Sequence, residues 1–135
     1  MTQNTENEES VGELCIQTVA MPADTNPNGD IFGGWLLSQM DIAGGIAARS
    51  HSGGRTVTIA VESKVFNKPV DVGDVVCCYA DLERVGNTSM TFRIEVWAIR
   101  RESFVREKVT EGVFTYVAIG PDGTSRAIQK ETTDT

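Results

Sequence analysis

One carboxylate stands alone in a long apolar stretch of the chain. Asp41 is the only ionisable side chain between Ile31 and Ala48. The apolar residues of this stretch recur at helical spacing on nearly every side, which predicts a buried helix. A buried carboxylate is costly unless it is paired, protonated or faces a cavity. Asp41 is either a satisfied structural residue or a functional carboxylate, and we favour the second interpretation because perturbed carboxylates are enriched at active sites.

Two glycines open the predicted helix. The turn-forming sequence NPNGD precedes them at positions 26–30, and Gly33 and Gly34 begin the apolar run. The first N–H groups of a helix are unpaired donors that suit an oxyanion or a thioester carbonyl oxygen, although close helix packing explains two glycines about as well. Asp41 lies about 10 Å further along the helix axis than Gly34. A carbonyl held by one protomer's glycine amide could therefore meet a water activated by another protomer's Asp41.

The remaining inventory excludes several kinds of catalysis. A Ser-His-Asp or Cys-His site needs a histidine, and the only one, His51, is expected past the helix in a glycine-rich stretch. Cys15, Cys77 and Cys78 have no metal-ligand or redox spacing, which predicts small buried thiols and no disulfide. The sequence contains no phosphate-binding loop and no nucleophile elbow. We expect neither a metal site nor a cofactor.

Composition limits the partners. The formal net charge is −7 over 135 residues, which fits one domain and argues against nucleic acid as a partner. No apolar run is long enough to span a bilayer, and the first ten residues are too polar for a signal peptide, so we expect a cytoplasmic protein. We expect a disordered acidic tail at 1–11, a folded domain at 12–128 and a flexible tail at 129–135.

Alternating patterns predict an α+β fold. Strands are expected at 14–20, 55–67, 74–85, 88–101 and 104–119, with the helix between the first two. The last four should form an antiparallel meander that curves around the helix. Val57, Ile59, Val61 and Val65 would face the helix, with Ser63 on the same stripe. The Ser63 hydroxyl would satisfy a backbone carbonyl or help to hold a water near Asp41.

Two segments carry a family resemblance. DTNPNGDIFGGWLLSQMD at the helix and VESKVFNKPVDVGDVV after it resemble the hotdog-fold acyl-CoA thioesterases, in particular the YciA-like bacterial group, and the resemblance extends from Leu14 to about Ile128. It implies a hotdog fold, with Asp41 as general base or nucleophile. It also implies that Gly34, with Gly33 as a second candidate donor, polarises the thioester carbonyl, and that Asn26 is contributed across a homodimer. Such dimers often assemble as trimers of dimers, and coenzyme A belongs to the substrate and product.

The resemblance also implies a coenzyme A contact at the hairpin near position 86. The residues concerned are Arg84, Val85, Gly86, Thr88 and Ser89, with Arg126 as a further base. An ordinary tight turn explains this hairpin equally well. Trp35, Leu37, Met40 and Phe66 could line an acyl tunnel, although such residues are more often core.

The sequence leaves three questions open. The enzyme could have broad acyl specificity or a narrow preference for aryl-CoA. The chain could instead be a non-catalytic acyl-CoA-binding regulatory module. Direct attack by Asp41, which gives an anhydride, and base-assisted attack of water are equally compatible with the residues.

Overall fold

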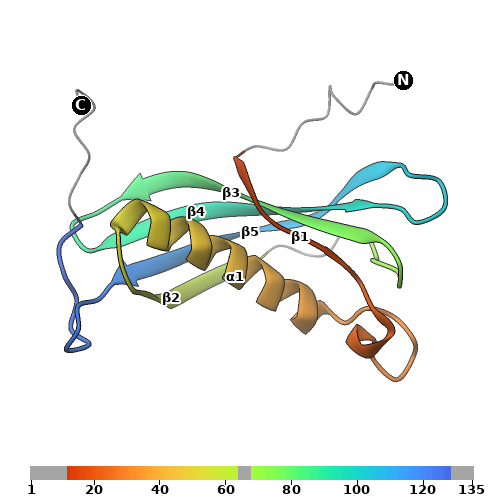
Figure 1. The fold of residues 1–135 in the computed structure, drawn as a ribbon, viewed down its shortest axis with the longest axis horizontal. Helices are drawn as coiled ribbons and strands as arrows, with labels where there is room; N and C mark the ends of the chain where they lie inside the picture. The colour runs from red at the N-terminus through yellow and green to blue at the C-terminus, as the bar shows by residue number, and fades with distance from the viewer. Residues whose placement is uncertain (1–11, 64–67, 129–135) are drawn as a thin grey trace.

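The computed structural model describes residues 12–63 and 68–128, in which one long helix lies across one face of an antiparallel sheet (Figure 1). The helix is α1 (Gly33–Ser52), and a short 3-10 helix (Pro22–Asp24) precedes it. The strands are β1 (Glu13–Val19), β2 (Thr56–Ser63), β3 (Val75–Val85), β4 (Ser89–Ile99) and β5 (Arg106–Ala118). The predicted order of one strand, one helix and four strands is confirmed. The tails predicted at 1–11 and 129–135 lie outside the described residues.

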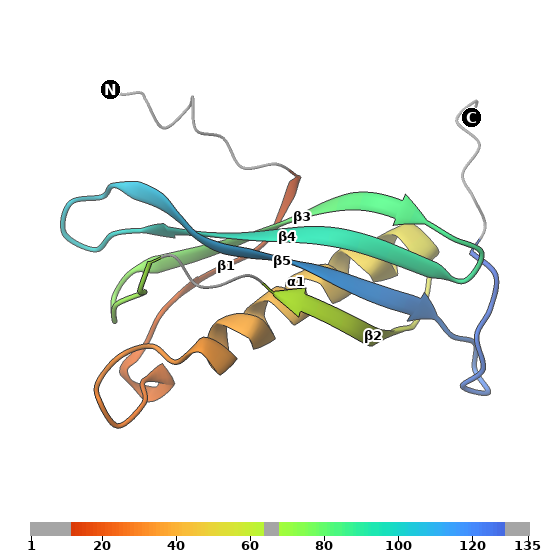
Figure 2. The same ribbon diagram turned by 180° about the vertical axis from the view of Figure 1, so that it is seen from behind.

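The sheet order corrects the predicted four-stranded meander. The order is β1-β3-β4-β5-β2, so only β3, β4 and β5 follow one another as hairpins. β2 pairs with β5 at one edge, as seen from behind in Figure 2. The connection between β2 and β3 spans 64–74, which is too long for a tight hairpin, and β1 takes the free edge of β3. The two outermost strands of the described sheet are therefore β1 and β2.

Helix α1 is buried on one face only, which corrects the prediction of a helix buried all round. Leu36, Met40 and Ala43 are at most 2% exposed against the sheet. Ile42 and Ile46, on the opposite side at helical spacing, are 51% and 48% exposed. An isolated protomer thus leaves large apolar side chains of its central helix uncovered.

The end of α1 follows the predicted glycine signal. Gly53 adopts a left-handed backbone conformation with φ of 76°, and its N–H donates to the Arg49 carbonyl at 2.9 Å. The helix extends to Ser52, so His51 lies in its last turn rather than beyond it. The His51 ring lies 5.8 Å from that of Phe92.

A bulge in β2 corrects the predicted apolar stripe. The pairing with β5 shifts between Thr58 and Ala60, so Thr58 and Val61 both lie opposite inward-facing aromatic residues of β5. Val57 pairs with Val117 and points to the other face. Val57, Ile59 and Val61 are 41%, 57% and 48% exposed, because β2 lies at the sheet edge. Simple alternation cannot anticipate a bulge, which reverses the facing of every later residue.

The adjacent cysteines Cys77 and Cys78 point to opposite faces of the sheet. Cys78 lies in the core under α1, and Cys77 accepts a hydrogen bond from Gln17 on the other face at 3.5 Å. Burial raises the pKa of Cys78 to about 12. Cys15 is half-buried, and all three cysteines are free thiols.

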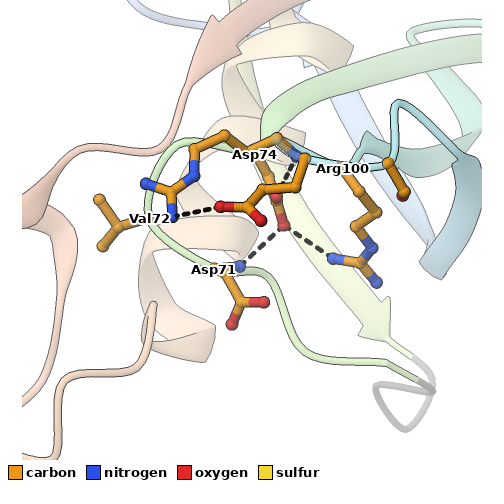
Figure 3. Close-up of a pocket in the computed structure, with 7 residues that line it drawn as sticks. Asp71, Val72, Asp74 and Arg100 are labelled. Atoms are coloured by element: carbon orange, nitrogen blue, oxygen red, sulfur yellow. Dashed lines mark hydrogen bonds and ion pairs between the residues drawn. The ribbon is translucent and has the colours of Figure 1, made fainter.

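A cluster around Asp74 fixes the connection that follows β2. The Asp74 side chain is 3% exposed, and Oδ2 accepts hydrogen bonds from the Asp71 N–H at 2.9 Å and from Arg100 Nη1 at 2.8 Å (Figure 3). The Arg101 N–H donates to Oδ1 at 3.0 Å. Arg100 also bonds Glu107 at 2.8 Å, which ties the connection to β5. A pocket of about 450 Å³ at this place is lined by Asp71, Val72, Asp74, Arg100, Arg101, Glu102 and Ser103.

The Asp74 cluster predicts a large stability effect. Asp74→Ala should lower the free energy of unfolding by about 3–5 kcal/mol, because the half-buried Arg100 guanidinium loses one of its two carboxylate partners and the N–H groups of Asp71 and Arg101 lose their acceptor. Urea denaturation at fixed protein concentration measures this change. Glu102→Ala is the control, since the Glu102 side chain is 81% exposed and its ion pair with Arg101 contributes little. Equal stability of the two variants would contradict a structural role for the cluster.

Candidate functional site

The Asp41 carboxylate is held at one oxygen by hydroxyls from two neighbouring strands. Thr58 Oγ1 on β2 donates to Asp41 Oδ1 at 2.7 Å. Tyr116 Oη on β5 lies 3.2 Å from the same Oδ1 and 3.0 Å from the Asp41 backbone oxygen. Thr58 and Tyr116 are direct partners in the β2–β5 register, so sheet pairing itself brings the two hydroxyls together. Within residues 12–63 and 68–128, Asp41 Oδ2 accepts no hydrogen bond and remains able to take a proton.

Tyr116 reaches the helix through a gap left by a glycine. A Cβ on Gly44 would lie 2.1 Å from the Tyr116 hydroxyl oxygen, so only glycine allows this approach. Tyr116 is 1% exposed. Burial raises the pKa of Tyr116 well above its ordinary value, and the charge and hydrogen bond of Asp41 raise it further. The phenol therefore stays protonated and acts as a donor.

Sequence reasoning missed Thr58, Tyr116 and Gly44. Strict alternation placed Thr58 on the face away from the helix, and the bulge returns it to Asp41. Tyr116 is 75 positions from Asp41, and no local pattern links the two. The available signal was a tyrosine on the inward stripe of the last strand together with a glycine three residues after Asp41, since a buried phenol needs a hydrogen-bond partner.

The start of α1 leaves backbone donors open. Phe32 precedes the helix without a side-chain cap, and Gly33 and Gly34 are both exposed. A Cβ on Gly34 would lie 3.3 Å from the Phe32 ring, which is tight but not prohibitive. The Trp35 N–H donates to the Phe32 carbonyl at 3.1 Å, whereas the amides of Gly33 and Gly34 have no acceptor inside the helix. This geometry suits an anionic or carbonyl oxygen and keeps the predicted role of Gly34 available.

Asn26 organises the loop that leads into α1. Its Oδ1 accepts hydrogen bonds from the N–H groups of Asn28 at 2.9 Å and of Asp30 at 3.1 Å. The Asn26 N–H donates to the Asp30 carbonyl at 2.8 Å. Asp30 is thus a turn residue, as its sequence position suggests. The Asn26 oxygen is used within the loop, and its amide nitrogen is the group left for a ligand.

The residues predicted to contact coenzyme A lie together at the other end of the molecule, beside the C-terminal end of α1 (Figure 1). The Gly86 N–H donates to the Ser89 carbonyl at 2.7 Å, and Val85 pairs with Met90, which makes the ordinary part of a hairpin. Thr88 accepts from the Ala118 N–H through its carbonyl. Arg84 is exposed, with one guanidinium nitrogen 3.4 Å from the Thr91 hydroxyl.

Arg126 joins the same end but has a structural task. Its guanidinium donates to the Ser52 carbonyl at 3.1 Å and to the Ile119 carbonyl at 3.0 Å. The bond to Ser52 caps the C-terminus of α1, and the bond to Ile119 ties it to the segment that follows β5. Arg84 is therefore the better placed of the two arginines to contact a phosphate.

The remaining predicted residues are dispersed. Trp35 and Leu37 are half-buried at the edge of the core, and Met40 is fully buried in it. Ser63 is exposed at the end of β2 on the inward-facing side. Phe66 lies outside the described residues.

The described part of the chain shows neither a metal-binding cluster nor a membrane-spanning helix. In residues 12–63 and 68–128, no group of three or more His, Cys, Asp or Glu could hold a metal ion. No helix there is long and apolar enough to cross a membrane. The expected lack of a cofactor and the cytoplasmic location stay predictions.

Comparison with known proteins identifies the family. A model of the thioesterase superfamily matches residues 28–104, and the chain belongs to this superfamily. Its architecture is the hotdog fold, as the resemblance implied. The chain is 54% identical over 123 residues to the Acyl-CoA thioester hydrolase YciA of Escherichia coli (strain K12), which covers 89% of this chain and 93% of that protein. The predicted resemblance to the YciA-like group is confirmed.

Solved structures agree with this assignment. A hexameric broad specificity acyl-coenzyme A thioesterase has a TM-score of 0.88 and 50% identity over 93% of this chain and 87% of that chain. A hexameric thioesterase from Yersinia pestis has a TM-score of 0.87 and 53% identity over 91% of this chain and 100% of that chain. An uncharacterized acyl-CoA thioester hydrolase from Haemophilus influenzae is 51% identical over 126 residues, which is 91% of this chain and 82% of that protein.

Proposed function

We propose that the chain hydrolyses acyl-CoA thioesters of broad acyl range to free coenzyme A and a carboxylic acid, with Asp41 as the general base. The observation that carries this proposal is the Asp41 carboxylate, bonded by two hydroxyls at Oδ1 and open at Oδ2. The names of the similar proteins support the substrate class and the breadth of specificity.

The reaction needs one proton acceptor and one oxyanion site. Asp41 Oδ2 takes a proton from a water molecule while the water oxygen bonds to the thioester carbonyl carbon. A glycine amide at the start of α1 stabilises the oxyanion that forms on the carbonyl oxygen. The carbon–sulfur bond then breaks, and the proton held by Asp41 passes to the coenzyme A sulfur. Direct attack by Asp41 is the competing route, and a single turnover in ¹⁸O-water distinguishes it by placing the label on the enzyme carboxylate.

One protomer cannot supply both groups to the same carbonyl. Gly34 and Asp41 lie on the same helix, about 10 Å apart along its axis. We therefore place each site between two copies, with Asp41 from one and the start of α1, including Gly34 and Asn26, from the other. Two exposed surfaces support such pairing: the unpaired edge of β2 and the uncovered Ile42 and Ile46 of α1. The hexameric state of similar enzymes supports a trimer of such dimers.

Replacement of Asp41 tests the function. Asp41→Asn should reduce kcat on the order of 10² to 10⁴-fold because the general base is lost. Thiol release from short, medium, long and aromatic acyl-CoAs measures it. Asp81→Asn, on the opposite face of the sheet from α1, is the matched control and should retain activity.

The same panel separates the alternatives. Hydrolysis of one aromatic acyl-CoA alone would indicate a narrow aryl-CoA enzyme. Binding of acyl-CoA by the wild-type protein without any turnover would indicate a regulatory module. Near-normal kcat in folded Asp41→Asn protein would show that Asp41 is not the base.

Mixed subunits test the shared site. Asn26→Asp keeps an oxygen for the Asn28 and Asp30 amides but removes the amide donor, and Asp41→Asn removes the base. Co-expressed dimers that contain one subunit of each kind hold one site with both residues intact, so they should recover about half of the wild-type activity. Activity no higher than that of the parent variants, in dimers verified to be mixed, would place both residues in one protomer's site.

The two arginines near the hairpin should behave differently. Arg84→Ala should raise KM for acyl-CoA several-fold with kcat nearly unchanged, and should not affect an acyl-pantetheine substrate, because we place Arg84 against the coenzyme A phosphates. Arg126→Ala should lower the free energy of unfolding by about 1.5–3 kcal/mol, because two carbonyls lose a charged donor. Steady-state kinetics and urea denaturation measure the two effects. An equal rise in KM for both substrates would remove Arg84 from the phosphate site.

A further inference from the structure

We propose that Tyr116 is a positioning residue for hydrolysis, which fixes Asp41 Oδ1 so that Oδ2 faces the attacking water. This inference rests on the proposed function and names a residue that acts through Asp41 rather than on the substrate. The basis is the contact of the Tyr116 hydroxyl with both the carboxylate and the backbone oxygen of Asp41, at 3.2 and 3.0 Å. No other described side chain contacts both the carboxylate oxygen Oδ1 and the backbone oxygen of Asp41.

The two acceptors give the hydroxyl a place in each stage of the reaction. A phenol has one proton and can donate it to one oxygen at a time or share it between two. While Asp41 is ionised, the carboxylate oxygen is the stronger acceptor. When Oδ2 takes up a proton, Oδ1 accepts less strongly, and the backbone oxygen at 3.0 Å receives the phenol proton instead. The buried donor is therefore never left without a partner, a state that costs about 1–3 kcal/mol.

The surroundings of Tyr116 hold its ring in one place. The Phe114 ring is stacked near it, with centroids 6.5 Å apart and planes at 16°. The Phe92 ring meets it edge-on at 6.1 Å. Gly44 lies against the hydroxyl on the helix side, where any side chain would collide with it. The Tyr116 hydroxyl thus has little freedom to leave Asp41, and the same contacts fix the height of the carboxylate above the sheet.

Asp41 is the charged group to which the Tyr116 hydroxyl donates. The titratable groups of the described strands that pack under α1 are Tyr116 on β5, Cys15 on β1 and Cys78 on β3, while β2 and β4 present Thr58 and Phe92. Burial raises the pKa values of Cys15 and Cys78, so both thiols stay neutral. On α1 itself, Arg49 and His51 lie in the last turn, two turns or more beyond Asp41. Among the described strands under α1, no charged side chain therefore competes with Asp41 for the Tyr116 hydroxyl.

Tyr116→Phe removes only the hydroxyl and keeps the packed ring. We expect kcat to fall about tenfold with KM nearly unchanged, because the carboxylate loses one of its two supports and is misplaced in the transition state. Tyr79→Phe is the matched control, since the Tyr79 hydroxyl accepts a bond from Arg106 on the opposite face of the sheet.

The Asp41→Asn background separates positioning from general destabilisation. If Tyr116 acts through Asp41, adding Tyr116→Phe to Asp41→Asn should not lower kcat further. Independent, multiplicative losses would overturn the proposal, and so would wild-type kinetics in the single variant. If the wild-type protein itself releases no thiol from acyl-CoA, the proposed function fails first, and this outcome is distinct from a wild-type enzyme that is indifferent to Tyr116→Phe.

A second measurement leaves Tyr116 in place, so it does not depend on how the variant folds. The chain has two tyrosines, so Tyr79→Phe protein grown with [¹³Cζ]tyrosine carries one labelled tyrosine. The Cζ signal should shift when Asp41→Asn is introduced, because the carboxylate that accepts the hydroxyl bond is lost. An unchanged Cζ signal would show that the Tyr116 hydroxyl does not donate to the Asp41 carboxylate, and it would overturn the proposal.

Discussion

The structure around the candidate site depends on how a single carboxylate is accommodated on an apolar helix. A charge on α1 must be either solvated or bonded, and Asp41 is bonded by hydroxyls from β2 and β5. Because those two strands are paired in register at Thr58 and Tyr116, the sheet order is a condition for the site. Had β2 paired with β3 as a meander, β2 and β5 would not be neighbours. The Thr58 and Tyr116 hydroxyls would then not meet at a common carboxylate oxygen. Gly44 completes the arrangement, since any side chain there would keep the helix away from Tyr116.

The same constraint is the reason why we propose that one protomer supplies only part of a site. Helix geometry fixes the distance from the open amides at the start of α1 to Asp41, and no side-chain movement shortens it. The large apolar side chains left uncovered, among them Ile46 at 48% and Ile59 at 57%, lie on the helix and on the edge strand that also carry the carboxylate and its partner Thr58. A second copy that covers this surface brings its own helix start within reach. Assembly and catalysis then depend on the same surface, which is consistent with the hexameric states of similar thioesterases.

Local sequence patterns predicted the helix and the strands, whereas long-range pairing determined which residues meet at the site. Asp41, the helix and its glycine stop could be recognised from the sequence because helical spacing and capping act over a few residues. The position of Thr58 could not, because one extra residue in β2 reverses the facing that alternation predicts. Tyr116 could not be recognised as a site residue, because its partner Asp41 is remote in sequence and the inward-facing residues of its strand are typical of a hydrophobic core. The protein partners of Arg126 could not be predicted either, because they are helix and loop carbonyls that only the fold brings together.

Two carboxylates of the described residues, the buried Asp74 and the half-buried Asp41, are held in opposite ways, and the difference separates stability from function. Asp74 receives donors on both oxygens, from Asp71, Arg101 and Arg100, so its bonding capacity is used to fix a connection. Asp41 receives both of its described side-chain donors on one oxygen, and those donors are neutral hydroxyls. An arginine at Asp41 would hold the carboxylate more strongly, but it would also weaken it as a proton acceptor. Neutral donors on Oδ1 orient the group while leaving Oδ2 open to a water molecule, which is the arrangement that the proposed general base requires.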